Sequence, residues 1–154
     1  MISILDVALE RISDRCCSQY ELRLYLQKEF ASLPNLESSI NSTFNRLEEL
    51  ELINDMRLAT NLAQRYAHKG DRFIRHVLHQ KGISEETTDE VLLSLADEDI
   101  RALDEARKKL AELWDCSENA MNLLERFLSG RSFSGSVIKA VIGQLGEQQS
   151  CSLN

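Results

Sequence analysis

The sequence contains little of what β-rich or membrane proteins require. Its 154 residues include one proline and six glycines, too few for the many tight turns of a β-sandwich or barrel. No segment shows the sustained apolar–polar alternation of a strand, and no apolar run approaches the roughly 20 residues of a membrane-spanning helix. The apolar content of 43% is enough for a core, so we expect a folded, all-α protein.

Cysteine is scarce and poorly placed for cross-linking. Cys16 and Cys17 are adjacent, which suits neither a structural disulfide nor the spacing of a zinc site, and Cys116 and Cys151 lie far from them in sequence. Free thiols are typical of a reducing compartment. The first ten residues have no basic leader before their apolar part, unlike a secretory signal. We therefore predict a cytoplasmic protein.

A weak internal repeat is the main positive feature of the chain. Residues 24–30 (LYLQKEF) resemble 77–83 (VLHQKGI) and 127–133 (FLSGRSF), so the repeated ends lie 53 and 50 positions apart. A period of this length predicts an array of small helical units, and such arrays usually act as binding surfaces.

Apolar residues spaced three and four apart predict about nine helices in three triplets. Ser18 and Glu21 form a capping-box pattern, whereas Gly70 and Gly82 suit helix ends. A helix from Asp97 to Trp114 is predicted to carry Ile100 on its inward face. Because each unit alone has a thin core, we expect neighbouring units to pack into an elongated, curved array. The predicted bounds are 3–53, 54–96 and 97–146 for the three-helix repeats, followed by a flexible tail at 147–154.

Charge is distributed unevenly along the chain, whose net charge is −7. Residues 65–81 hold five basic residues against Asp71, a net charge of +4, together with all three histidines. Residues 82–105 hold nine acidic residues against Arg101, a net charge of −8. The acidic residues in first helical turns suit the positive helix end, and a protein-binding face or a barrier to misplaced nucleic acid is the alternative.

The basic segment has an ordered pattern. Arg72, Arg75, His76 and His79 follow i, i+3, i+4, i+7 spacing and therefore share one helix face, opposite an apolar face. This face is either a solvated surface that balances the acidic segment or a binding surface for acidic protein or phosphates. Exposed salt bridges contribute less than about 1 kcal/mol, so stability alone gives little reason for the arrangement. The candidate partner- or phosphate-binding residues are Arg65, Lys69, Arg72, Arg75, His76, His79 and Lys81.

No catalytic, cofactor-binding or metal site is predicted. The sequence has no glycine-rich phosphate loop, and its histidines all lie in one basic segment. His76 and His79 have a spacing that could ligate a metal, but Arg72 and Arg75 would repel a cation. We therefore expect a protein that is not an enzyme.

A pattern of apolar, acidic and Lys-Gly-Ile positions runs through residues 8–23, 47–59, 74–83 and 124–138. Taken together, these segments resemble the RecX family, which regulates the bacterial recombinase RecA, and the likeness extends over residues 4–145. This chain departs from the family pattern at Glu51 and Ser132, where the family usually has glycine, and in the shorter turn after Gly70.

The resemblance implies tandem three-helix repeats without catalysis or cofactor. It implies binding to the RecA nucleoprotein filament and modulation, usually inhibition, of strand exchange and coprotease activity in DNA repair and the SOS response. We expect a monomer that contacts no membrane and touches single-stranded DNA weakly or through the filament. Two alternatives remain: a helical protein-interaction adaptor that has diverged from recombinase control, and a weak single-stranded DNA binder.

Overall fold

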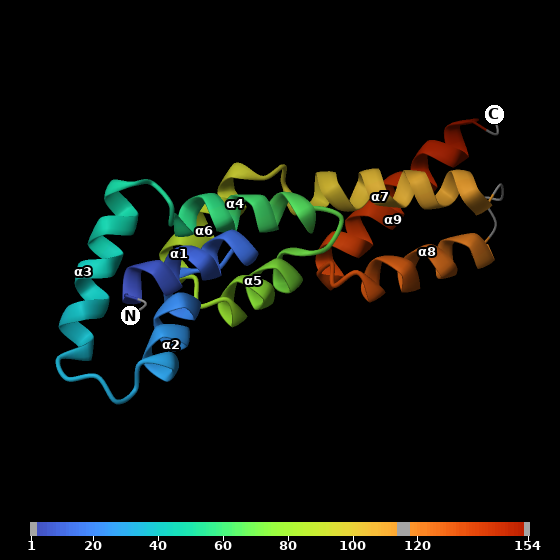
Figure 1. The fold of residues 1–154 in the computed structure, drawn as a ribbon. Coiled ribbons are helices and arrows are strands. Elements are labelled where there is room, and N and C mark those ends of the chain that lie inside the picture. Colours follow the sequence, from blue (N-terminus) through green and yellow to red (C-terminus); the bar gives the residue numbers. More distant parts are fainter. Residues whose placement is uncertain (1–2, 114–117, 153–154) are drawn as a thin grey trace. The chain divides into compact units, whose positions relative to one another are not determined.

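The computed structural model describes residues 3–113 and 118–152, and within them it contains nine α-helices and no strand (Figure 1). The predicted all-α fold is confirmed. None of the described helices is both long and apolar enough to cross a membrane. The helices are α1 (Ile4–Asp14), α2 (Gln19–Glu29), α3 (Leu36–Glu49), α4 (Asp55–Arg65), α5 (Asp71–Gln80), α6 (Glu85–Ser94), α7 (Glu98–Leu113), α8 (Glu118–Gly130) and α9 (Gly135–Ser152).

Polar side chains cap the starts of several helices. The Ser18 hydroxyl accepts a hydrogen bond from the Glu21 amide at 3.1 Å, and the Glu21 carboxylate accepts one from the Ser18 amide at 3.1 Å. This pair is the predicted capping box of α2. Ser84 and Ser134 likewise accept amide hydrogen bonds at the starts of α6 and α9. Each cap pairs an amide that the first helical turn leaves without a partner.

The chain forms two compact units. Unit 1 combines the chain up to Asn61 with Leu78–Asp89, and unit 2 combines Leu62–Val77 with the chain from Glu90 onward. The boundary passes through α4, α5 and α6, so each unit contains part of all three middle helices. The division into repeats at 3–53, 54–96 and 97–146 stays a prediction, as does the flexibility of residues 147–154, although α9 continues to Ser152.

Each unit has its own hydrophobic core. In unit 1, helices α1, α2 and α3 pack on one another, and in unit 2, helices α7, α8 and α9 do the same. Burying a large apolar side chain stabilises a fold by roughly 1.5–3 kcal/mol, so these clusters are the main source of stability. The buried cluster of unit 1 is Ala8, Leu22, Leu26, Ile40, Phe44, Leu47 and Ile53. The buried cluster of unit 2 is Ala102, Ala106, Leu124, Leu128, Phe133, Ile138, Val141 and Leu145.

One residue of the predicted inward face of α7 points outward, whereas Leu103 and Ala106 contribute to the core as predicted. Ile100, predicted to face inward, is 57% exposed, whereas its neighbour Arg101 is 7% exposed. Ala102 and Ala106 are fully buried and make the close contact with the rest of the unit 2 core. The prediction for Ile100 was wrong because small side chains, and not the largest apolar one, occupy this close packing position.

Three helix ends use a residue with left-handed backbone conformation. These residues are Glu51, Gly82 and Ser132, with φ of 56°, 78° and 66°. In each turn the next amide donates back to the preceding helix, as Ile83 does to the Leu78 carbonyl at 3.0 Å. The predicted role of Gly82 is confirmed. Glu51 and Ser132 adopt a conformation that costs a non-glycine residue about 1 kcal/mol.

Gly70 is required for a different reason from the one that the sequence suggested. It does not end a helix, because α4 stops at Arg65 and Gly70 comes directly before α5. A Cβ atom at Gly70 would lie 2.0 Å from the Ser132 carbonyl oxygen. Close approach of two backbone segments within unit 2 therefore excludes a side chain at this position.

Replacing Ser132 with glycine should stabilise the protein. The S132G variant relieves the left-handed conformation and should raise the melting temperature by about 2–4 °C, corresponding to about 1 kcal/mol. The same substitution inside α8, S129G, should lower the melting temperature because glycine is unfavourable within a helix. Thermal unfolding followed by circular dichroism measures both, and equal shifts in the two variants would contradict the assignment.

Candidate functional site

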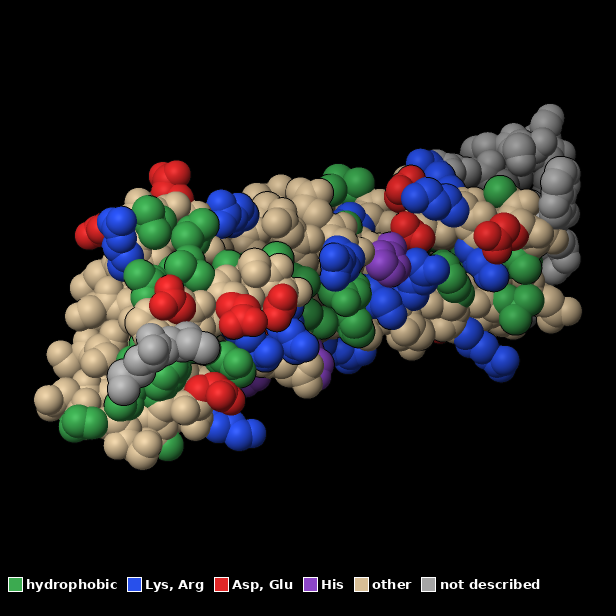
Figure 2. Space-filling model, viewed as in Figure 1, with side chains coloured by type: hydrophobic (Ala, Val, Ile, Leu, Met, Phe, Trp, Pro, Cys, Tyr) green, Lys and Arg blue, Asp and Glu red, His purple; other side chains and the backbone are tan. Residues whose placement is uncertain are grey.

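The exposed part of the predicted basic surface lies on helices α4 and α5. Arg65 is exposed at the end of α4, and Arg72, Arg75, His76 and His79 are exposed on α5. The opposite face of α5 is buried through Ile74 and Leu78. Figure 2 shows lysine and arginine side chains beside α5, and a histidine is plainly visible over the segment that joins α4 to α5. The two-faced helix is as predicted, and its binding role stays a prediction.

Lys69 and Lys81 are less available than the sequence suggested. The Lys69 ammonium lies 4.5 Å from the centre of the Phe73 ring, where the negative face of the ring attracts it. The Lys81 ammonium lies 3.4 Å from the Glu21 carboxylate. Both side chains are half-buried, so both serve partly in internal contacts.

A buried arginine holds the beginning of the basic helix in place. The Arg101 guanidinium donates to the carbonyls of Ala96 at 2.8 Å, Ala67 at 3.1 Å and Lys69 at 2.6 Å, and it forms an ion pair with the carboxylate of Asp71. A buried charge is tolerated only when it is paired and hydrogen-bonded, and these four partners meet that need. Arg101 thus fixes the segment that leads from α4 into α5.

A second arginine supports the same segment. The Arg131 guanidinium lies 3.1 Å from the Glu105 carboxylate and donates to the His68 carbonyl at 3.5 Å. Its central carbon also lies 4.5 Å from the centre of the Phe127 ring. The Arg131 carbonyl accepts a hydrogen bond from the Gly70 amide at 2.8 Å. The start of α5 is therefore anchored from both α7 and the end of α8.

The sequence prediction missed both anchoring arginines, although one signal was present. Arg101 lies 43 positions after Leu58. The two residues hold equivalent places at helix starts, because the Leu58 amide donates to the Asn54 carbonyl and the Arg101 amide donates to the Asp97 carbonyl. A charged residue at the position of an apolar one in the preceding repeat indicates either exposure or a buried, paired charge. The sequence alone does not distinguish these two cases. In the fold, residues 67–71 contact Arg101, so its charge is buried and paired.

Units 1 and 2 contain the same kind of junction. In unit 1 the Ser18 hydroxyl at the start of α2 donates to the Lys81 carbonyl. In unit 2 the Gly70 amide at the start of α5 donates to the Arg131 carbonyl. Lys81 and Arg131 occupy equivalent positions in the sequence repeat. In each unit, a helix start thus meets the end of a helix from later in the chain.

Glycine fits tightly at the junction of unit 1 as it does in unit 2. A Cβ atom at Gly82 would lie 2.4 Å from the Tyr20 side chain. The start of α2 is also fixed by Asp55, whose carboxylate accepts a hydrogen bond from the Gln19 amide at 2.9 Å. Burial raises the pKa of the Asp55 carboxyl, and nearby Glu21 raises it further, although the Gln19 hydrogen bond lowers it.

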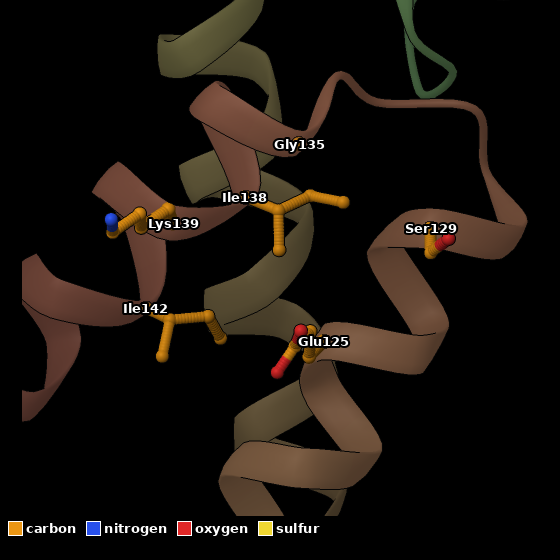
Figure 3. Close-up of a pocket in the computed structure, with 6 residues that line it drawn as sticks. All are labelled: Glu125, Ser129, Gly135, Ile138, Lys139 and Ile142. Atoms are coloured by element: carbon orange, nitrogen blue, oxygen red, sulfur yellow. The ribbon is translucent and has the colours of Figure 1, made fainter.

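An open hollow of about 410 Å³ lies between α8 and α9. Figure 3 shows Ile138 and Ile142 of α9 and Glu125 of α8 lining it, with the Lys139 amino group pointing away from the Glu125 carboxylate. Its walls contain no cysteine or histidine.

A smaller hollow of about 160 Å³ in unit 1 is lined by Cys16 and Cys17, again without a histidine. Both thiols are free. Burial raises the pKa of the Cys17 thiol, and the charge of Glu21 raises it further, so the reactive thiolate is disfavoured. Among the described residues, no three His, Cys, Asp or Glu side chains are grouped to hold a metal ion. Cys116 and the side chain of Cys151 lie outside the described residues.

Removing the Arg101 side chain should destabilise unit 2. R101A leaves three carbonyls and the Asp71 carboxylate without their donor, so we expect the free energy of unfolding to fall by roughly 2–4 kcal/mol. The matched control is R107A, because Arg107 is exposed on the same helix and its loss should change stability by less than about 0.5 kcal/mol. Urea unfolding measures both, and equal stability of the two variants would refute the anchoring role.

The sequence was compared with family profiles, with curated proteins and with solved structures. No known family profile matches the sequence. A relative from Chlorobium phaeobacteroides (strain BS1), "Regulatory protein RecX", is 32% identical over 143 residues, which is 91% of each chain.

Solved structures support the fold. The crystal structure of RecX from Lactobacillus salivarius superposes with a TM-score of 0.73 at 23% identity, covering 92% of this chain and 94% of the other. A second crystal structure of a regulatory protein RecX has a TM-score of 0.66 at 21% identity, and the match covers 90% of this chain and 70% of the other. Together with the 32% identity over nine-tenths of the chain, these likenesses show that the chain belongs to the RecX family of regulatory proteins.

Proposed function

We propose that this chain is a non-catalytic regulator that binds the RecA nucleoprotein filament and inhibits recombinase and coprotease activity in DNA repair. The observation that carries the proposal is the similarity to a RecX regulatory protein over 91% of both chains. The proposal implies a cytoplasmic monomer that acts by binding alone.

The exposed face of α5 is the surface that we assign to the filament. Arg72 and Arg75 present planar guanidinium groups, which bind carboxylates or phosphates through two parallel hydrogen bonds. His76 and His79 extend the same face and add further hydrogen-bonding groups. An acidic protein surface or an exposed DNA backbone within the filament would match this face.

The anchored start of α5 favours such binding. Because Arg101 and Arg131 hold the backbone at residues 67–71, little order has to be gained when Arg72 and Arg75 meet a partner. A filament also repeats its subunits, so several weak contacts from one regulator add to a stronger total affinity. The negative segment after Gly82 would limit binding to free DNA.

Titration into preformed RecA filaments on single-stranded DNA tests the proposal. We expect the native protein to lower ATP hydrolysis and strand exchange. The R72E/R75E variant should bind at least tenfold more weakly, because two cations are reversed, and its affinity should depend less on salt. The control is R107E/R126E, which makes the same change of charge at exposed positions outside α5. Co-sedimentation at two salt concentrations gives both affinities.

Three other results would contradict parts of the proposal. Native protein that leaves ATP hydrolysis and strand exchange unchanged would support an adaptor with another protein partner. Tight binding to bare single-stranded DNA that falls steeply with added salt would support a direct nucleic-acid binder. Equal binding by R72E/R75E and R107E/R126E would reject the assignment of the α5 face alone.

A further inference from the structure

Large apolar side chains are exposed at the turn between α6 and α7. Leu93 is 85% exposed at the end of α6, and Ile100 is 57% exposed in the first turn of α7. Single exposed apolar side chains are common, but here two large ones lie on either side of one three-residue turn. We name residues 90–100 corner 2.

Corner 2 has a fixed backbone. The Ala96 carbonyl accepts a hydrogen bond from the buried Arg101 guanidinium at 2.8 Å, and the Asp97 carbonyl accepts one from the Arg101 amide at 3.0 Å. The Glu98 carboxylate accepts a hydrogen bond from the Ser134 amide at 3.1 Å, which ties the corner to the start of α9. Leu93 and Ile100 therefore project from a rigid turn, and they would lose little order on binding.

The charge around corner 2 is of one sign. Glu90, Asp97 and Asp99 are exposed, and no lysine or arginine occurs between residues 82 and 100. The first basic residue that follows is Arg101, which is buried and paired. Such a surface repels phosphates, and so disfavours nucleic acid and anionic membranes. It favours a protein surface on which lysine and arginine side chains surround an apolar pocket.

The turn between α3 and α4 in unit 1 also exposes apolar and acidic side chains, although two arginines lie beside them. We name residues 48–56 corner 1. Its exposed apolar side chains are Leu50 at 43%, Leu52 at 39% and Met56 at 38%. Glu48, Glu49 and Glu51 are exposed too; Arg46 lies 3.2 Å from the Glu49 carboxylate, and the Arg57 guanidinium donates to the Glu51 carbonyl at 3.3 Å.

The two corners are equivalent in the repeat. Leu50 precedes Leu93 by 43 residues, the same interval that separates Asn54 from Asp97. Asn54 and Asp97 both accept the amide four residues later, at 3.1 and 3.0 Å. The same combination of exposed apolar and acidic side chains therefore occurs twice, once in each unit.

We infer that corners 1 and 2 are docking points for successive subunits of a repeating protein assembly, each fitting an apolar pocket edged by lysine and arginine. The inference rests on the proposed function, in which this assembly is the RecA filament. Exposed leucine and isoleucine on a fixed backbone supply the apolar contact. The surrounding carboxylates select a basic protein surface and speed association. This surface is separate from the basic face of α5.

Full-length variants tested by co-sedimentation with preformed RecA filaments on single-stranded DNA decide the point. L93S/I100S should weaken binding at least tenfold, as should L50S/M56S, and combining all four changes should weaken it further. The matched control is L123S, because Leu123 is 49% exposed on α8 outside both corners. All these side chains are at least partly exposed, so thermal unfolding should show folded variants. E90Q/D99N should reduce both the affinity and its dependence on salt.

The possible outcomes separate this inference from the proposed function. Native binding that L93S/I100S and L50S/M56S retain at the level of L123S overturns the docking role while the proposed function stands. Native protein that fails to sediment with filaments overturns the proposed function, and the inference falls with it. A native dimer that L93S/I100S converts to monomer in analytical ultracentrifugation shows that a second copy covers corner 2, which also overturns the inference.

Discussion

Unit 2 depends on one buried cation. The Arg101 guanidinium is surrounded by three backbone carbonyls and one carboxylate. These carbonyls lie at helix ends or in turns, where regular helical hydrogen bonds do not pair them. Its partners come from the segment before α5, the first residue of α5 and the turn before α7. A single guanidinium therefore sets the positions of two surfaces, the basic face of α5 and corner 2. The Arg101 hydrogen bonds hold these connecting segments where no regular helical hydrogen bond does so.

The two units share one kind of junction. In each unit, a helix start meets the end of a helix from later in the chain, at Lys81 in unit 1 and at Arg131 in unit 2. Each junction leaves no space for a side chain on a neighbouring glycine, Gly82 or Gly70. Such tight contacts hold the two segments of each junction in fixed positions, because no change of side-chain rotamer can relieve them. Under the proposed function, a regulator that acts by binding would need this rigidity more than an internal cavity.

Local signals in the sequence were sufficient for most of the fold. Helical spacing of apolar residues predicted the helices, hydroxyl caps such as Ser18 predicted their starts, and Gly82 predicted a left-handed helix end. The two faces of α5 followed from spacing alone. What could not be predicted depends on contacts between distant segments: the burial of Arg101, the exposure of Ile100 and the close approach at Gly70. The same limit explains why Lys69 and Lys81 were grouped with the exposed cations, since their ring and carboxylate partners become neighbours only in the folded chain.

The most direct test of the account is a double-mutant cycle for filament affinity that combines R101A with R72E/R75E at a temperature where all variants are folded. Arg101 is buried and cannot touch a partner, so an effect on affinity must come from the position of α5. The account predicts that R101A alone weakens binding about tenfold, and that R72E/R75E weakens binding less in the R101A background than in the native protein. Native affinity in R101A, or full additivity of the two changes, would contradict it.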